Sequence, residues 1–229
     1  LLDGGMGTML QAAGLKLGAR PEELNITDPA LIEGIHGQYA AAGSRIVNAN
    51  TFGASAHKLA GSAYTLEQVI TAGIENCKRA CAPYGALTAL DVGPLGELLE
   101  PSGTLAFEDA VTEYARIVKA GEAAGADLIF FETYTDLYEL KAALLAAKEN
   151  THLPILASMS FEAGGRTFTG CTVESFAATA RGLGADAVGI NCSLGPKEIF
   201  PMAKRLAEAV PGNFPVFVKP NAGLPRADG

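Results

Sequence analysis

The feature that most constrains this chain is a repeated alternation of short apolar runs with longer amphipathic segments. Nearly all-apolar runs are typical of parallel strands that are covered on both faces. In the segments between them, apolar residues recur every three or four positions, which predicts helices. A chain of 229 residues can bury one large core. We predict strands at residues 1–3, 45–50, 86–91, 128–132, 155–160, 187–191 and 216–219.

Two architectures share this alternation, the doubly wound sheet and the eight-stranded barrel. A polar residue ends every predicted strand, and a barrel gathers all these ends around one mouth, whereas an open sheet uses only those near its switch point. We therefore predict an α/β fold, a (β/α)8 TIM barrel apparently lacking strand eight, with one domain over residues 1–229. The strand ends are Asp3, Asn50, Asp91, Glu132, Ser160, Asn191 and Lys219.

Charge and hydropathy narrow the class of partner. The net charge is −8 and the 17 Lys and Arg residues are scattered, so a nucleic-acid partner is not expected. No apolar run approaches the roughly 20 residues that span a bilayer. The N-terminal stretch LLDGGMGTML lacks the basic flank and cleavage site of a signal peptide. We expect a cytoplasmic protein that acts on a small molecule, with no membrane partner.

Two acidic strand ends suggest a cationic ligand. Asp3 opens the stretch DGGMGT, which is either a tight turn or a helix start whose free N–H groups could hold a carboxylate. Glu132 emerges from an apolar run, and a buried acid needs a cation or several donors. Together these two carboxylates would suit an ammonium group. The alternative is a structural ion pair with Lys219.

Lys219 itself allows a second function. A lysine at the mouth of a barrel can lose its proton when it is desolvated and then form a Schiff base with a carbonyl substrate. That would make the protein an aldolase-like lyase. No other residue points to a carbonyl substrate, so this hypothesis ranks second.

The four cysteines do not suggest a disulfide scaffold. Cys77 and Cys81 share an apolar stripe with Ile70 and Ile74, which favours core packing over chelation of a metal. Cys171 lies in a Gly- and Thr-rich loop without a nearby ligand and has no assigned role.

Cys192 follows the predicted strand 187–191 and is either a nucleophile, a metal ligand or a packing residue. A nucleophile needs a base, and of the three histidines only His57 falls on the mouth side of the barrel. Zinc needs about three further ligands, so one cysteine is a weak signal. From this chemistry alone, core packing is favoured.

Seven stretches, in order, resemble the homocysteine S-methyltransferase family, and within it the homocysteine-binding module of cobalamin-dependent methionine synthases. They cover nearly the whole chain and read LLDGGMGTML, PEELN, NANTFGAS, DVGPLG, FFET, GINCS and KPNAG. The resemblance implies the barrel fold and a transfer of a methyl group to the sulfur of L-homocysteine, giving methionine.

The resemblance also implies a zinc ion held by three cysteines. Cys192 matches the first, and the other two are an adjacent pair on the last strand that does not occur in this sequence. Zinc would deprotonate the substrate thiol, because the thiolate is the nucleophile. With one of three ligands, residues 1–229 are expected to be inactive alone, and we expect the natural protein to be longer.

The remaining roles follow from the same resemblance. Asp3 and Glu132 would hold the amino group of homocysteine. Its carboxylate would bind backbone N–H groups around Gly4 and the turn at Thr51 and Phe52. Ser158 and Asn191 would orient neighbouring residues.

In that family the methyl carrier is methylcobalamin on a separate module, and folate, cobalamin and activation modules belong to the longer chain. A third hypothesis is a non-catalytic fragment that binds homocysteine without turnover.

Overall fold

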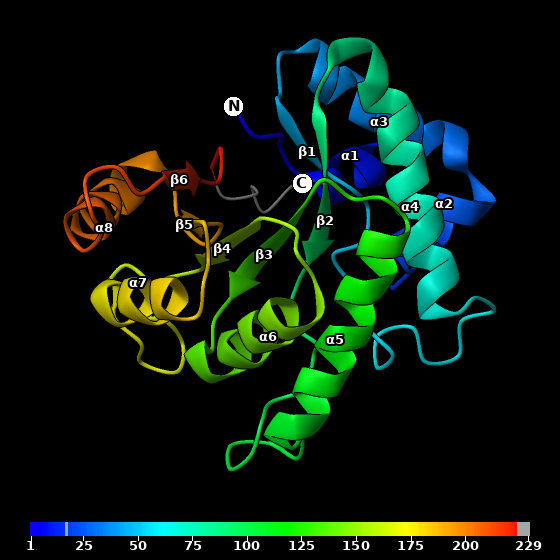
Figure 1. The fold of residues 1–229 in the computed structure, drawn as a ribbon. Coiled ribbons are helices and arrows are strands. Elements are labelled where there is room, and N and C mark those ends of the chain that lie inside the picture. Colours follow the sequence, from blue (N-terminus) through cyan, green and yellow to red (C-terminus); the bar gives the residue numbers. More distant parts are fainter. Residues whose placement is uncertain (17, 224–229) are drawn as a thin grey trace.

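The structure, a computed structural model, describes residues 1–16 and 18–223. Within these residues, parallel strands form one curled six-stranded sheet in the order β1 to β6, and helices cover its outer side (Figure 1). The strands are β1 (Ile46–Asn48), β2 (Leu87–Val92), β3 (Leu128–Tyr134), β4 (Ile155–Met159), β5 (Ala187–Asn191) and β6 (Val216–Lys219). The α-helices are α1 (Met6–Ala12), α2 (Leu24–Thr27), α3 (Pro29–Ala41), α4 (Leu66–Cys81), α5 (Phe107–Ala123), α6 (Leu137–Asn150), α7 (Val173–Gly182) and α8 (Pro196–Glu208), with short 3-10 helices at Pro21–Glu23 and Ala82–Tyr84.

The first predicted strand, residues 1–3, is the one that does not form. Only Leu2 pairs in parallel with Ile46, as an isolated bridge. Gly4 and Gly5 follow at once and disfavour extended pairing, and no described segment pairs with the other side of Leu2. The other six predicted strands coincide with β1 to β6 within two residues at each end. The curled parallel sheet is confirmed, whereas the eight-stranded closure remains a prediction.

Local sequence signals account for where several helices begin. Thr65 and Gln68 form the reciprocal capping box that starts α4. The Asp28 side chain accepts a hydrogen bond from the Leu31 N–H at the start of α3. Gly195 is the N-cap of α8, and Pro196 takes the first helical position, where the missing N–H of proline needs no partner. These caps fix the lengths of the loops that reach the mouth of the sheet.

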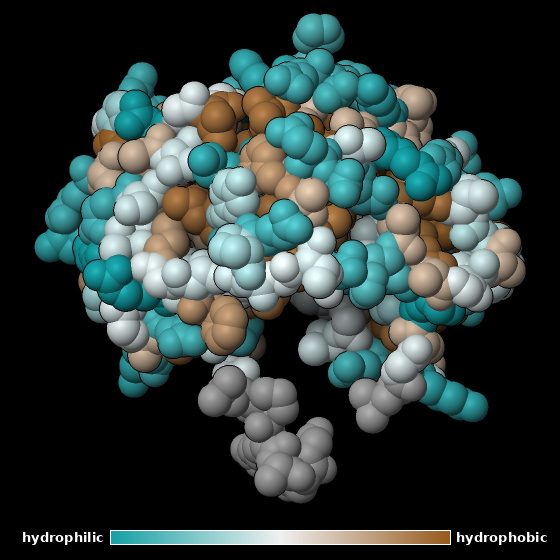
Figure 2. All heavy atoms as spheres, turned by 90° about the horizontal axis from the view of Figure 1, so that it is seen from below, coloured by the Kyte–Doolittle hydropathy of each residue, from teal (hydrophilic) through white to brown (hydrophobic). Residues whose placement is uncertain are grey.

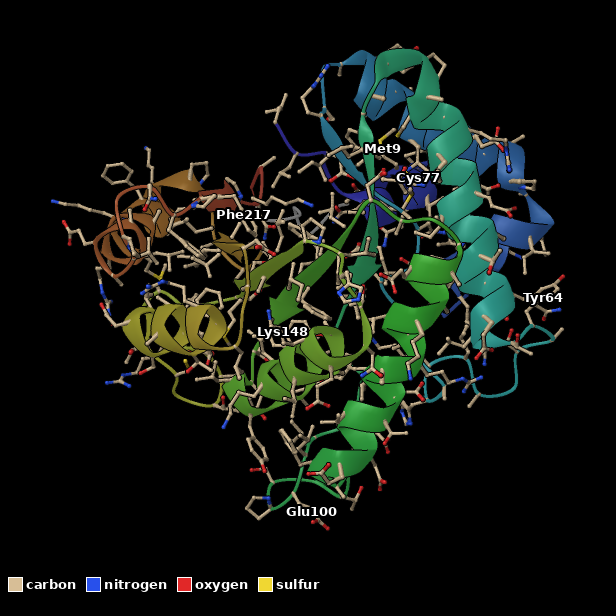
Figure 3. All side chains as sticks on the ribbon, viewed as in Figure 1. Met9, Tyr64, Cys77, Glu100, Lys148 and Phe217 are labelled. Carbon is tan, nitrogen blue, oxygen red and sulfur yellow. The ribbon has the colours of Figure 1, made fainter. Side chains whose placement is uncertain are left out.

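Each strand separates two apolar layers. On β3, Ile129 and Phe131 belong to the large cluster between sheet and helices. Leu128 and Phe130 point to the concave side and pack with Phe217 of β6, whose ring centroid lies 5.1 Å from that of Phe130 (Figure 3). The concave side is therefore apolar at its base, and polar residues follow only toward the C-terminal ends of the strands.

The outer surface carries many hydrophilic side chains. Figure 2 shows them spread over the face seen from below, with hydrophobic residues between them. Among the described helices, none is both long and apolar enough to cross a membrane.

Candidate functional site

A cavity of about 910 Å³ occupies the concave side of the sheet. The N-terminal segment 1–7 lines one side of it and residues 215–221 line the other. Its base is apolar, and its lining there includes Leu2, Ile46, Leu156 and Phe217. At the carboxyl ends of the strands the lining changes to charged and polar side chains. Active sites in barrel folds lie at this end, so this polar part is the candidate site.

Three charged side chains meet at the mouth of the cavity. Lys219 Nζ lies 3.2 Å from Asp3 Oδ1 and 3.2 Å from Glu132 Oε2. The three side chains are 16%, 4% and 15% exposed, respectively. The structure thus contains the ion pair that the sequence offered as an alternative. The ammonium group of Lys219 lies between these two carboxylates, and their binding of a ligand amino group stays a prediction.

Burial and charge act in opposite directions on these groups. Burial raises the pKa of Asp3 and of Glu132, and the neighbouring Lys219 ammonium opposes that rise. Burial alone would lower the pKa of Lys219, but the surrounding carboxylates raise it above its ordinary value. Lys219 therefore stays protonated and is a cation in this site.

Two more polar residues lie deeper in the cavity lining. Asn48 and Asp91 are 6% and 7% exposed. Among the described residues, no partner lies within hydrogen-bonding distance of Asp91 Oδ1 or of either side-chain amide atom of Asn48. Burial, and next the charge of Glu132, raise the pKa of Asp91 well above its ordinary value. Asp91 is among the polar strand ends named from the sequence, but no role was assigned to it there. Asn48 was not singled out, and the only sequence signal for it is that it is polar within the otherwise mostly apolar run IVNAN.

Cys192 follows β5 in a strained turn. Cys192 and Ser193 each have φ 58°, and Thr133, beside them on β3, has φ 67°. Non-glycine residues rarely adopt such angles, and they concentrate at functional sites. The Cys192 N–H donates to the Lys219 carbonyl at 3.0 Å, which ties this turn to the end of β6. The thiol is consequently held at the mouth, among the residues that line the cavity.

A chain of hydrogen bonds orients that thiol. The Ser158 hydroxyl donates to Asn191 Oδ1 at 2.9 Å, and Asn191 Nδ2 donates to Cys192 Sγ at 3.3 Å. The same Nδ2 donates to Thr133 Oγ1 at 2.7 Å. Burial raises the pKa of the Cys192 thiol. These contacts link Ser158 and Asn191 to the Cys192 thiol, and they include Thr133, which the sequence did not single out.

Of the three residues predicted to bind the substrate carboxylate, two line the cavity and one does not. Gly4 and Phe52 line the cavity, and a side chain at Gly4 would come within 2.9 Å of the Tyr39 ring. Thr51 does not line it, because its hydroxyl donates to the Asp91 carbonyl at 2.8 Å and accepts the Asp91 N–H at 3.1 Å. The Thr51 N–H also donates to the Ala49 carbonyl. Thr51 therefore positions Asp91 and does not face a ligand.

The other cysteines lie away from the cavity. Cys77 and Cys81 are buried in the core, with their sulfur atoms 3.8 Å apart (Figure 3). Cys171 is half-buried in a loop outside the cavity lining, and burial raises its pKa to about 11. Within residues 1–16 and 18–223, no three His, Cys, Asp or Glu side chains form a group that could hold a metal ion. Cys192 is a suitable soft ligand for zinc, but it does not make a zinc site alone.

Comparison with known proteins identifies the family. Methionine synthase of Mycobacterium tuberculosis is 32% identical over 97% of this chain, and that of Mycobacterium leprae is 33% identical over 97%. The chain spans about one fifth of the length of each, 20%. The metallated form of the homocysteine methyltransferase MmuM from Escherichia coli has the same fold, with a TM-score of 0.86 at 23% identity over 97% of this chain and 84% of that one. The family model for homocysteine S-methyltransferase matches residues 1–229, and the chain belongs to that family.

Proposed function

We propose that this chain binds L-homocysteine and presents its sulfur for methylation to methionine, as the homocysteine-activating module of a methionine synthase. The observation that carries the proposal is the pairing, in one cavity, of an ammonium site with an oriented thiol in a chain of this family. Homocysteine carries an amino group at one end and a thiol at the other. The cavity offers a matching group for each.

Asp3 and Glu132 would hold the amino group of the substrate. The Lys219 ammonium seated between them supports this role, because it has the same charge and donor geometry as the ligand group. Backbone N–H groups around Gly4 and the turn at Phe52, both in the cavity lining, would take the carboxylate. The substrate would thereby be fixed at its amino-acid end, leaving its thiol to reach toward the β5 side of the mouth.

Cys192 would be one of three thiolate ligands to zinc, and the other two would come from sequence outside residues 1–229. Zinc, when bound, lowers the pKa of a coordinated thiol so that it is a thiolate at neutral pH. The protein's own contribution is positional: Asn191 and Thr133 contact the Cys192 sulfur and set its direction. The metallated form of the E. coli relative supports the presence of a metal in this family.

The methyl group would arrive on methylcobalamin carried by a separate module. The length of the methionine synthases, of which this chain covers 20%, leaves room for folate, cobalamin and activation modules. Residues 1–229 would then supply the acceptor substrate, with the donor supplied elsewhere in the protein.

The Schiff-base hypothesis is less favoured. A Schiff-base lysine must be neutral to attack a carbonyl carbon, and the carboxylates around Lys219 hold its pKa above the ordinary value. Borohydride trapping of a carbonyl compound on Lys219 would revive it.

Zinc content per chain tests the proposal. We expect a form of the chain extended beyond residue 229 to bind about one zinc ion, as in three-ligand catalytic sites. Cys192→Ala should abolish zinc binding in that form. Cys171→Ala is the matched control, because it removes a thiol outside the cavity and should leave the zinc content unchanged.

Two results would contradict the proposal. If the extended chain binds no zinc, or if C192A and C171A bind it equally, Cys192 is a packing residue. A third result would favour the hypothesis of a non-catalytic fragment. In that case the extended chain, supplied with methylcobalamin, would bind homocysteine but transfer no methyl group to it.

A further inference from the structure

The ammonium site leaves two buried groups in the same cavity without a function. Asp91 Oδ1 and the side-chain amide of Asn48 have no hydrogen-bond partner among the described residues, although both residues are more than nine-tenths buried. An unsatisfied buried polar group destabilises the folded state. Such groups are rare in folded proteins and usually have a specific reason. Both residues line the cavity, and the Asn48 amide acts on the Asp91 carboxyl without making a close hydrogen bond to it, so a ligand in the cavity could reach both groups.

Asp91 lies close to the ammonium site. Its ionisation is affected by the charges of Glu132, Lys219 and Asp3, and by the amide of Asn48. The sheet brings these residues together: β1 and β2 pair with Asn48 opposite Ala89, two residues before Asp91 on the same face. The Asn48 N–H in turn donates to Asp3 Oδ2 at 2.7 Å. One continuous polar patch therefore runs from Asp3 through Asn48 to Asp91.

The three N–H donors of a primary ammonium group match three carboxyl groups of the cavity, those of Asp3, Glu132 and Asp91. A primary ammonium has three N–H donors, and the described contacts of the Lys219 ammonium with acceptor side chains are the two to Asp3 and Glu132. A third acceptor is needed to satisfy such a group in a buried site. Asp91 Oδ1, which makes no close hydrogen bond within the described part of the chain, is an acceptor in the same cavity.

We propose that Asp91 is the third carboxyl group of the ammonium subsite and accepts a hydrogen bond from the amino group of the bound amino acid, with Asn48 as its supporting neighbour. This inference rests on the proposed function and deepens it. Asp91 is then a specificity-determining residue, which favours ligands that carry an α-amino group over otherwise identical ligands that lack one.

Charge balance in the cavity is consistent with this role. When Lys219 and the ligand amino group are both present, two cations face three carboxyl groups. A nearby cation favours the ionised form of an acid. Burial raises the pKa of Asp91, and an ammonium group entering the cavity opposes that rise and favours the carboxylate.

The test compares two ligands and two proteins by isothermal titration calorimetry. The ligands are L-homocysteine and 4-mercaptobutanoate, which keeps the thiol and carboxylate but lacks the amino group. The proteins are the full chain and its Asp91→Asn variant, which has the same shape and no charge. Because Asn keeps an acceptor oxygen but loses the charge, we expect D91N to weaken L-homocysteine binding about tenfold, as for a charge-assisted hydrogen bond replaced by a neutral one. Binding of 4-mercaptobutanoate should change less than twofold.

The outcomes separate this inference from the proposed function. If D91N weakens both ligands equally, or neither, Asp91 does not act through the amino group and the inference is wrong. If the unchanged protein binds neither ligand, the proposed function fails and the inference falls with it. Asp91→Ser is the second variant, and it serves if circular dichroism finds D91N unfolded.

Discussion

His36 on α3 is a buried titratable residue that the proposed site does not use. It is 0% exposed, and neither ring nitrogen has a partner within the described part of the chain. Burial lowers its pKa to about 4, because the interior disfavours the charged imidazolium. The unfolded chain, with an ordinary histidine, binds more protons than the folded one between about pH 6.5 and 4. The contribution of His36 to the free energy of unfolding is therefore fully present above about pH 6.5 and is lost as the pH falls toward 4.

We predict that His36→Leu makes the protein less sensitive to acid. The free energy of unfolding of the unchanged protein should drop by up to about 3 kcal/mol between pH 7 and pH 4 on account of His36, and H36L should lack this part of the drop. Urea unfolding at both pH values measures it. His152→Gln, at an exposed position, is the matched control. A drop of equal size in H36L would contradict the prediction.

Single residues differ in how readily the sequence predicts their roles. Glu132 is predictable because it lies near the C-terminal end of a recognisable strand. Asp3 follows a predicted strand that does not form, yet its carboxylate contacts the same Lys219 ammonium. Thr51 misled the prediction because backbone hydrogen bonding to Asp91 consumes its hydroxyl, and no sequence pattern reports such a contact. Thr133 was missed for the same reason: its role depends on a positive φ and on a neighbour 59 residues away.

Among the elements, β5 and β6 depend on a close approach between a glycine and an aromatic ring. The two strands pair with Gly189 opposite Phe217, and a Cβ at Gly189 would overlap the Phe217 ring. We predict that Gly189→Ala destabilises the fold by about 1–3 kcal/mol, the usual cost of overpacking. Thermal unfolding measures the change.

A second substitution makes this prediction specific. Phe217→Leu should recover part of the loss in the G189A background, because the smaller side chain frees the space above residue 189. Gly37→Ala is the control: it lies in the interior of α3 with no atom near its would-be Cβ, and it should stabilise by about 0.5–1 kcal/mol through helix propensity. Additive effects of G189A and F217L would mean that the two side chains do not compete for space.

At the scale of elements, six strands and their helices were predictable because apolar runs and caps are local signals. The strand at residues 1–3 was not, because its formation depends on a neighbour on each side. Leu2 has one neighbour, β1, and the two glycines that follow weaken extended pairing. A strand whose pairing depends on other parts of the chain cannot be judged from its own residues.

For the whole molecule, the main consequence of the fold is a cavity on the concave side of the sheet. Segments 1–7 and 215–221 line opposite sides of the cavity, and its base is apolar. We predict that residues 1–229 bind the dye 8-anilinonaphthalene-1-sulfonate, and that a chain extended beyond residue 229 binds it several-fold less, because added sequence covers the apolar base. Fluorescence titration measures this.

Aggregation should follow the same order, since unpaired strand edges can associate. Light scattering on both forms at equal concentration provides the check. Equal dye fluorescence in the two forms would mean that the apolar base is already closed to solvent in residues 1–229.

The contact between Lys219 and Asp3 joins residues 216 positions apart. During synthesis, Asp3 and Glu132 are made long before Lys219, so this ion pair cannot form until residue 219 has left the ribosome. Every helix and strand described here precedes that moment or ends with it. A ribosome stalled earlier would therefore display the two acids without the lysine that neutralises them.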